Sequence, residues 1–223
     1  MPNWCSTTIQ FTPKDGGNMD AFMALLEKVN TFEETPWFKK NVGFPHVWLG
    51  SIAMVMGYEV DGMALSVDEH TGEFNVCPKT TQPDIQGCRG YIEFEFDPEQ
   101  ELYMGFVESA WAPPEELIDA IEEYCSIDTD WIAYEPGCEV FVNSNLDTFP
   151  DMFVFETEND TYYPVSEKEL LDIALSVGVV AGSYEELKQI IDQGDFYWSL
   201  NPYTDVYGEP WYLIKRKEGG ENA

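Results

Sequence analysis

The stretch YIEFEFD, residues 91–97, decides the fold class of this chain. Its isoleucine and phenylalanines alternate with three acids, Glu93, Glu95 and Asp97. Side chains along a strand point to opposite faces in turn, so this alternation predicts a strand with one face in the core and one face in water. Residues 103–110 predict a second strand directly after it.

A helix and two further strands are expected downstream of this pair. Pro113-Pro114 suits the first turn of a helix, which we expect to run to about Cys125. Its inward-facing residues are predicted to be Leu117, Ile118, Ile121 and Tyr124. Residues 130–135 and 139–143 then predict two strands joined by the turn Pro136-Gly137.

The chain upstream of residue 90 opens with a strand and a helix. Residues 3–11 alternate, with Cys5, Thr7, Ile9 and Phe11 on one side. Asn18 or Asp20 can cap a helix that runs to Asn30, with Phe22, Leu25, Leu26 and Val29 as its apolar stripe. Between residues 31 and 88 the clearest signal is a hairpin of 63–67 and 73–77 around the turn 68–72.

The last third of the chain reads as a separate unit. Ser166 with Glu169, and Ser183 with Glu186, each match a capping box. They predict helices over 167–177 and 184–193, the second ended by Gly194, followed by a strand-like segment 196–217. We therefore predict an α+β chain with one domain over 1–150, carrying an insert at about 31–88, and a small helical and β C-terminal unit over 151–223.

Acidic residues dominate the charge of the chain. The formal net charge is −31, and residues 90–167 hold 21 Asp or Glu with no Lys, Arg or His. The composition, 44% hydrophobic and 15% aromatic, is that of a folded protein, so the acids must lie on the surface of a packed core. Such a surface repels nucleic acids and anionic membranes and attracts basic proteins or cations. Adaptation to high salt is a competing explanation.

The remaining sequence features predict a soluble protein of the cytosol. The polar opening, Met1 to Cys5, is unlike a signal peptide, and no stretch approaches 18 apolar residues. Five cysteines at irregular spacing fit reduced thiols better than a disulfide framework.

Two motifs resemble a known family. The opening Met-Pro-Asn-Trp-Cys precedes an alternating strand, and Ala110-Trp111-Ala112-Pro113-Pro114 is followed by a helix and by Tyr134-Glu135-Pro136-Gly137. Together they resemble the YubB-like group, phage- and plasmid-borne proteins with a ferredoxin-like domain; Ala112 stands where that family usually has Ser. The resemblance implies a ferredoxin-like antiparallel sheet backed by two helices, and a mobile-element setting in a host cytoplasm. It carries no catalytic residues to this chain.

Catalytic and metal chemistry find little support in the sequence. His46 and His70 are isolated, so a nucleophile–base pair cannot be assigned. His70, Cys77 and Cys88 lack the spacing of a zinc site, and no phosphate-binding glycine loop follows a strand. We predict no catalytic residue, no metal and no cofactor.

The carboxylates themselves are the candidate site. Alternate strand residues are about 6.6–6.8 Å apart and helical residues four apart are about 6 Å apart, so both predicted elements carry regular rows of acids. The predicted partner-binding residues are Glu93, Glu95, Asp97, Glu115, Glu116, Asp119, Glu122, Glu123, Asp128 and Asp130. Regular negative charges imitate DNA, which gives the hypothesis of an anti-defence protein that blocks a basic, nucleic-acid-binding host protein such as a defence nuclease, a restriction enzyme or a CRISPR-type complex.

Two other hypotheses stay open. One is a small-molecule or metal-dependent enzyme with a pocket between the sheet and the insert, with Trp37, Trp48 and His46 at its mouth. The other is a structural or assembly protein whose charge serves solubility. The oligomeric state and the identity of the host target are not encoded in any of these patterns.

Overall fold

The computed structural model describes residues 3–14, 17–68, 70–78, 82–97, 102–135, 137, 140–145, 147–149, 152–156, 161–194, 199–202 and 204–205. The chain divides into two compact units, Met1–Val140 and Phe141–Ala223. The sequence predicts this division at residue 150.

The first unit is built on an antiparallel sheet. Its strands are β1 (Trp4–Pro13), β2 (Val47–Trp48), β5 (Gly90–Asp97), β6 (Leu102–Ala110) and β7 (Ile127–Glu135). They lie in the order β7-β1-β6-β5-β2, and neighbouring strands are antiparallel. The strand predicted from residues 91–97 is thus confirmed, as are those at residues 3–11 and 103–110.

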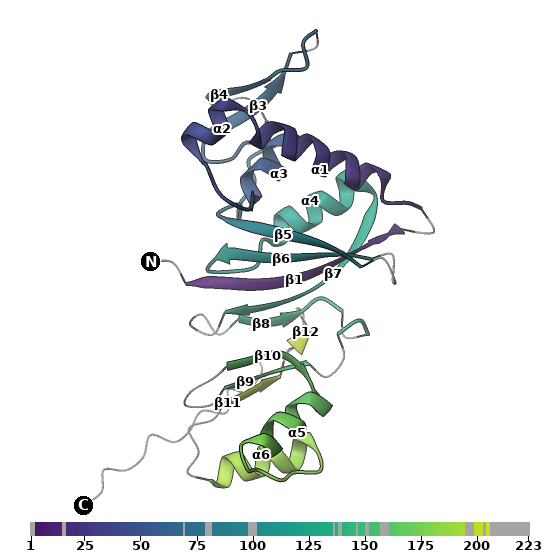
Figure 1. The fold of residues 1–223 in the computed structure, drawn as a ribbon, viewed down its shortest axis with the longest axis vertical. Coiled ribbons are helices and arrows are strands. Elements are labelled where there is room, and N and C mark those ends of the chain that lie inside the picture. The colour runs from purple at the N-terminus through teal and green to yellow at the C-terminus, as the bar shows by residue number, and fades with distance from the viewer. Residues whose placement is uncertain are drawn as a thin grey trace, which may run out of the picture. The chain divides into compact units, whose positions relative to one another are not determined.

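Helices cover one side of this sheet. α1 (Asp20–Glu33), α3 (Leu49–Met56) and α4 (Glu115–Cys125) all lie on the same side of β1, β5, β6 and β7 (Figure 1). The short α2 (Pro36–Asn41) follows α1, and Thr35 caps it by accepting a hydrogen bond from the Phe38 backbone N–H. The result is a sheet backed by helices, as the sequence predicts.

Aromatic packing joins the sheet to α1. Phe22 of α1 stacks on Phe11 of β1 with ring centroids 4.7 Å apart and meets Phe94 of β5 edge-on at 5.8 Å. Phe11 and Phe22 are fully buried. Burying rings of this size is the largest single contribution that side chains make to such a core. These contacts also identify the helix-covered face of β5 as the face of Ile92 and Phe94.

The other face of the sheet has no helix of the first unit on it. Since side chains alternate, Glu93 and Glu95 point to this open face, together with Trp4 and Ser6 of β1 and Phe106 of β6.

The insert after α1 is only partly predicted by the sequence. The hairpin is confirmed as β3 (Met63–Val67) and β4 (Phe74–Pro78). The sequence gives no signal for β2, which has two residues, nor for α3. α3 is buried over Leu49–Met54 and apolar almost all round, so it shows no helical periodicity.

The second unit has its own sheet and core. β9 (Met152–Glu156) lies between β10 (Thr161–Ser166) and β11 (Ser199–Pro202), and both neighbours are antiparallel to it. β8 (Val140–Asn143) pairs in parallel with β12 (Thr204–Asp205).

Two helices complete the second unit. α5 (Glu167–Ser176) and α6 (Tyr184–Gln193) confirm the predicted helices, and they share a core with β9. That core is formed by Phe153, Val165, Leu170, Ala174, Val179, Leu187 and Ile191.

Details of the helix ends correct the sequence predictions. The capping box of Ser166 and Glu169 is confirmed. At α6, Ser183 caps the Glu186 N–H as predicted, but the Glu186 carboxylate accepts from Gly182 N–H instead of closing the box. Tyr124, predicted to face inward, is 43% exposed, because Cys125 takes the buried position in the last turn of α4.

Of the predicted segment 196–217, residues 199–202 and 204–205 are strands as expected, and the remainder lies outside the described residues.

Candidate functional site: two acidic surfaces

α4 separates an apolar stripe from an acidic one. Leu117, Ile118 and Ile121 are buried against the sheet and α1. Glu115, Asp119 and Glu123 are exposed, and since they are four residues apart they follow one line along the helix at about 6 Å per step. We call these three residues the α4 acidic row.

The α4 acidic row is uncompensated. Within the described part of the chain, none of its carboxylates accepts a hydrogen bond or pairs with a basic side chain. Like charges at this spacing repel by a few tenths of a kcal/mol per pair. Of the three carboxylates, only that of Glu115 is stabilised by its position, because it lies in the first turn, where the helix dipole favours a negative charge.

The two other acids of α4 hold the fold together. Glu116 Oε2 accepts a hydrogen bond from the Gln86 N–H at 2.9 Å. Glu122 Oε1 accepts from both the N–H and the hydroxyl of Thr129, at 2.8 and 2.5 Å, and so ties α4 to β7. These predicted partner-binding residues therefore have internal structural contacts.

β5 carries the second predicted row. Glu93, Glu95 and Asp97 lie on alternate positions and face the open side of the sheet. Glu93 Oε1 lies 2.8 Å from Nδ1 of His46, and Asp97 also makes a contact of its own. Glu95 is exposed and has no partner in the described residues.

The last two predicted residues lie on β7, which two strands separate from β5 in the sheet. Asp128 pairs with Lys14 at 3.5 Å between carboxylate and amine. Asp130 lies opposite Gln10 of β1, on the open face, and has a contact of its own.

The ten predicted residues do not form one acidic face. The α4 acidic row projects from the helix layer, whereas the β5 and β7 acids face the open side of the sheet. The residues predicted above as one candidate site therefore lie on two surfaces, on opposite sides of the sheet. Sequence spacing placed each row correctly along its element but could not assign the side of the sheet.

The open face also carries residues that the sequence reasoning missed. Tyr91 of β5 lies directly opposite Glu108 of β6, which in turn lies opposite Ser6 of β1 and accepts a hydrogen bond from its hydroxyl at 2.6 Å. Trp4 is 42% exposed, and its ring centroid is 6.2 Å from that of Tyr91. The alternation of β1 predicts the face of Trp4, but its neighbours follow only from strand pairing.

A depression opens at the edge of β5 and bears on the enzyme hypothesis. Its volume is about 560 Å³, and its polar lining groups are Asn30, Glu33, His46 and Glu93. Burial raises the pKa of Glu33, although the carboxylate accepts a hydrogen bond from the Trp48 N–H at 3.0 Å. His46 lies at this site as predicted, whereas Trp37 and Trp48 are not among the lining residues. The described lining offers no hydroxyl or thiol nucleophile.

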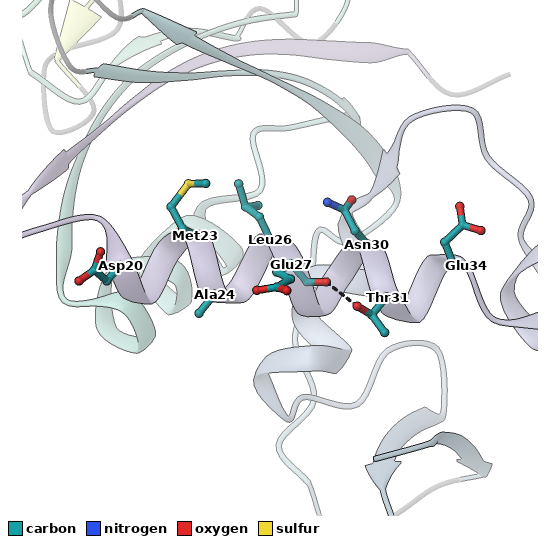
Figure 2. Close-up of a pocket in the computed structure, with 8 residues that line it drawn as sticks. All are labelled: Asp20, Met23, Ala24, Leu26, Glu27, Asn30, Thr31 and Glu34. Atoms are coloured by element: carbon teal, nitrogen blue, oxygen red, sulfur yellow. Dashed lines mark hydrogen bonds between the residues drawn. The ribbon is translucent and has the colours of Figure 1, made fainter. Parts of the chain in front are cut away.

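A larger hollow, about 710 Å³, follows the outer surface of α1 (Figure 2). All of its lining residues belong to that one helix: Asp20, Met23, Ala24, Leu26, Glu27, Asn30, Thr31 and Glu34. The Thr31 hydroxyl donates a hydrogen bond of 2.8 Å to the Glu27 carbonyl. This bond is the dashed line in Figure 2. A helix surface of this kind does not bring catalytic groups together from different elements.

Neither a metal-binding cluster nor a membrane-spanning helix is found among the residues that the structure describes. No group of three or more His, Cys, Asp or Glu side chains among the described residues could hold a metal ion. Over the same residues, no helix has the length and apolar character needed to cross a membrane.

Comparison with known proteins gives no family for the chain. No protein-family model matches it, and no curated protein or solved structure matches it either.

Proposed function

We propose that this chain is an acidic anti-defence protein that binds a basic, nucleic-acid-binding host protein in the host cytoplasm and blocks it by imitating DNA. The observation that carries the proposal is the α4 acidic row: three exposed carboxylates on a rigid helix, about 6 Å apart, with no partner among the residues that the structure describes. Alternate phosphates of one DNA strand are about 6.8 Å apart along the axis. A groove that accepts those phosphates fits this spacing.

The energetics also support a binding role. An exposed helix normally mixes charges of both signs, because like-charge pairs cost stability and opposite pairs add it. α4 has no basic residue at all. The repulsion is offset when a cationic surface covers the row.

The connectivity of the first unit supports the ferredoxin-like fold that we propose for it. With the insert removed, the elements run β1-α1-β5-β6-α4-β7, and the strands are ordered β7-β1-β6-β5. This order supports the proposal, because a split βαβ fold of two interleaved units would have the same order. The proposed relation to YubB-like mobile-element proteins agrees with that arrangement.

The test is affinity capture from a bacterial host lysate at low and at moderate salt, with elution by duplex DNA. The expected result is that nucleic-acid-binding proteins are retained, are released by duplex DNA, and are lost as salt rises. The variant Glu115→Lys/Asp119→Lys/Glu123→Lys should capture none of them.

A charge-matched control separates the row from the net charge. Glu27→Lys/Asp172→Lys/Asp192→Lys makes the same change in net charge at three scattered exposed positions. It should capture the same proteins as the unmodified chain, with only a weaker dependence on salt. Capture that is equal for the α4 variant and the unmodified chain would disprove DNA mimicry by this helix and leave charge for solubility as the better explanation.

The depression at β5 keeps an enzyme as the second candidate. One observation favours an enzyme: His46 pairs with Glu93 in the depression, and the same depression is lined by Glu33, whose pKa is raised by burial. Such pairs of ionisable groups in a hollow are typical of acid–base sites.

A further inference from the structure

The open face of the sheet carries an aromatic cluster centred on Tyr91. The rings of His46, Trp4 and Phe44 have centroids 5.1, 6.2 and 6.3 Å from that of Tyr91, and the planes of His46 and Phe44 are inclined to it by 26° and 30°. Phe106 lies on the same face, opposite Glu93. Phe44 is 46% exposed and Phe106 is 39% exposed. We call these five residues the Tyr91 patch.

Carboxylates flank the patch on two sides. Glu108 is the direct cross-strand neighbour of Tyr91, and Glu93 is the next residue along β5 on the same face. Glu108 uses one oxygen for the Ser6 hydroxyl, and Glu93 uses one for His46. Partial burial, together with the charges of Glu108 and Glu93, raises the pKa of the Tyr91 phenol. The patch is therefore an aromatic surface in a negative field.

Exposed rings on an antiparallel sheet can stack nucleic-acid bases, so that ligand has to be considered first. Base stacking in such sites is combined with basic residues that hold the phosphates. Here the nearest residues to Tyr91 within β5 and β6 on the same face are the carboxylates Glu93 and Glu108. Phosphates would be repelled where a nucleic-acid site must attract them.

A cationic side chain satisfies both features of the patch. Guanidinium groups stack on aromatic faces and form paired hydrogen bonds with carboxylates, whereas an ammonium group is a compact, strongly hydrated charge. We propose that the Tyr91 patch is a docking site for arginine side chains of a basic protein segment. The guanidinium stacks on Tyr91 and Trp4, and Glu108 and Glu93 accept its N–H groups.

This proposal rests on the proposed function only for the basic character of the partner. It adds a second surface, on the side of the sheet opposite to the α4 acidic row, and it adds a preference for arginine over lysine that net charge alone does not give.

The test uses fluorescence anisotropy with labelled poly-arginine and poly-lysine peptides of equal length, at about 0.1 M salt, where surface charges are screened over about 10 Å. The unmodified chain should bind poly-arginine more tightly than poly-lysine. Trp4→Leu and Tyr91→Leu leave the net charge unchanged, and each should weaken poly-arginine binding about two- to fivefold, as exposed cation–π contacts do. Tyr91→Phe keeps the ring and should retain most of the affinity.

The matched control is Phe96→Leu, which removes a half-exposed ring from the other face of the same strand. It should bind both peptides as the unmodified chain does. The Lys variant of the α4 acidic row should weaken both peptides alike and keep the arginine preference. Failure of the proposed function and failure of this inference therefore give different results.

Two outcomes would overturn the inference. One is a double variant Trp4→Leu/Tyr91→Leu that binds poly-arginine within twofold of the unmodified chain. The other is tighter binding of single-stranded oligothymidylate than of poly-arginine, which would make the patch a base-stacking surface. If the double variant loses its fold by circular dichroism, Glu93→Gln/Glu108→Gln decides the question by the same peptide comparison.

Discussion

Glu122 and Glu123 are neighbours on α4, yet their side chains have different roles. Glu122 holds the N–H and the hydroxyl of Thr129, whereas Glu123 points to solvent as part of the α4 acidic row. Replacing an acid that accepts internal hydrogen bonds lowers the stability of the fold. Replacing an exposed acid that has no such bonds should leave the stability nearly unchanged. The distinction is invisible in a chain with 42 acids and becomes clear from their hydrogen bonds.

Glu122→Ala should lower the free energy of unfolding by about 1–2 kcal/mol, because it removes a charged acceptor from two donors. Glu123→Ala is its matched control and should stay within about 0.5 kcal/mol of the unmodified chain. Urea unfolding followed by circular dichroism measures both. Equal effects of the two substitutions would contradict the assigned roles.

The cysteines should differ in reactivity according to burial. Burial raises the pKa of Cys5 and Cys88 to about 12 and that of Cys125 to about 11, from 9.0 in the unburied thiol. Only the thiolate reacts, so these residues should be alkylated by iodoacetamide at pH 8 at least about a hundredfold more slowly than the half-exposed Cys77. Peptide mass spectrometry measures the extent of alkylation at each cysteine. In urea, where the chain is unfolded, the four cysteines should react at similar rates.

The same burial predicts the sign of an alkaline effect on stability. A thiol whose pKa is raised in the folded state favours folding fully below its unfolded pKa of about 9, and this contribution is lost as pH rises towards 12. The midpoint of urea unfolding should therefore fall above about pH 9. Cys5→Ala/Cys88→Ala should reduce that fall, and an unchanged pH dependence in this variant would assign it to other groups.

At the scale of elements, α4 ends in a strained residue. Ser126 follows the helix with φ 53° and ψ 50°, the left-handed conformation that a side chain disfavours by roughly 1 kcal/mol. Ser126→Gly should therefore raise the free energy of unfolding by up to about 1 kcal/mol. Glu123→Gly, within the same helix, should lower it by about 0.5–1 kcal/mol. Thermal unfolding of the two variants should shift the midpoint in opposite directions.

The elements that could be predicted from the sequence are those with a regular polar face. Apolar and acidic residues alternate along β5, and apolar residues recur at helical spacing along α4. The strand and the helix predicted from these patterns are confirmed. α3 could not be predicted, because a helix buried on nearly all sides has no polar residues to mark its period. β2 is too short to show any period at all.

The two parts of the candidate site differ in how far the sequence predicts them. Spacing within one helix places Glu115 and Asp119 in the α4 acidic row, but only the hydrogen bonds of Glu122 show that Glu123 is its third member. The Tyr91 patch depends on pairing between β1, β5 and β6, which joins residues that are far apart in the chain. No local pattern records which strands become neighbours, so neither this patch nor the opposite orientation of the two acidic surfaces could be deduced beforehand.

At the scale of the whole molecule, self-repulsion should limit stability at low salt. With a net charge of −31, folding brings many acids together. Raising the salt concentration from about 0.01 to 0.15 M shortens the screening length from about 30 to 8 Å. The thermal midpoint should rise over this range and then level off.

A nonionic osmolyte at equal osmolarity should give a smaller rise, and scanning calorimetry can compare the two. A midpoint that keeps climbing into molar salt would instead identify adaptation to a saline environment. That result would explain the acidity without any partner.

The sheet of the first unit has one further consequence, because α4 lies on one face of it, whereas Tyr91 belongs to the opposite face, which no helix of the first unit covers. Whatever covers α4 leaves Tyr91 reachable. Two positively charged bodies, or two parts of one assembly, can thus be held at once without competing, and each contact raises the effective concentration of the other. If both proposed surfaces bind, the avidity of the protein comes from the arrangement of two weak contacts on one sheet and not from a single strong contact.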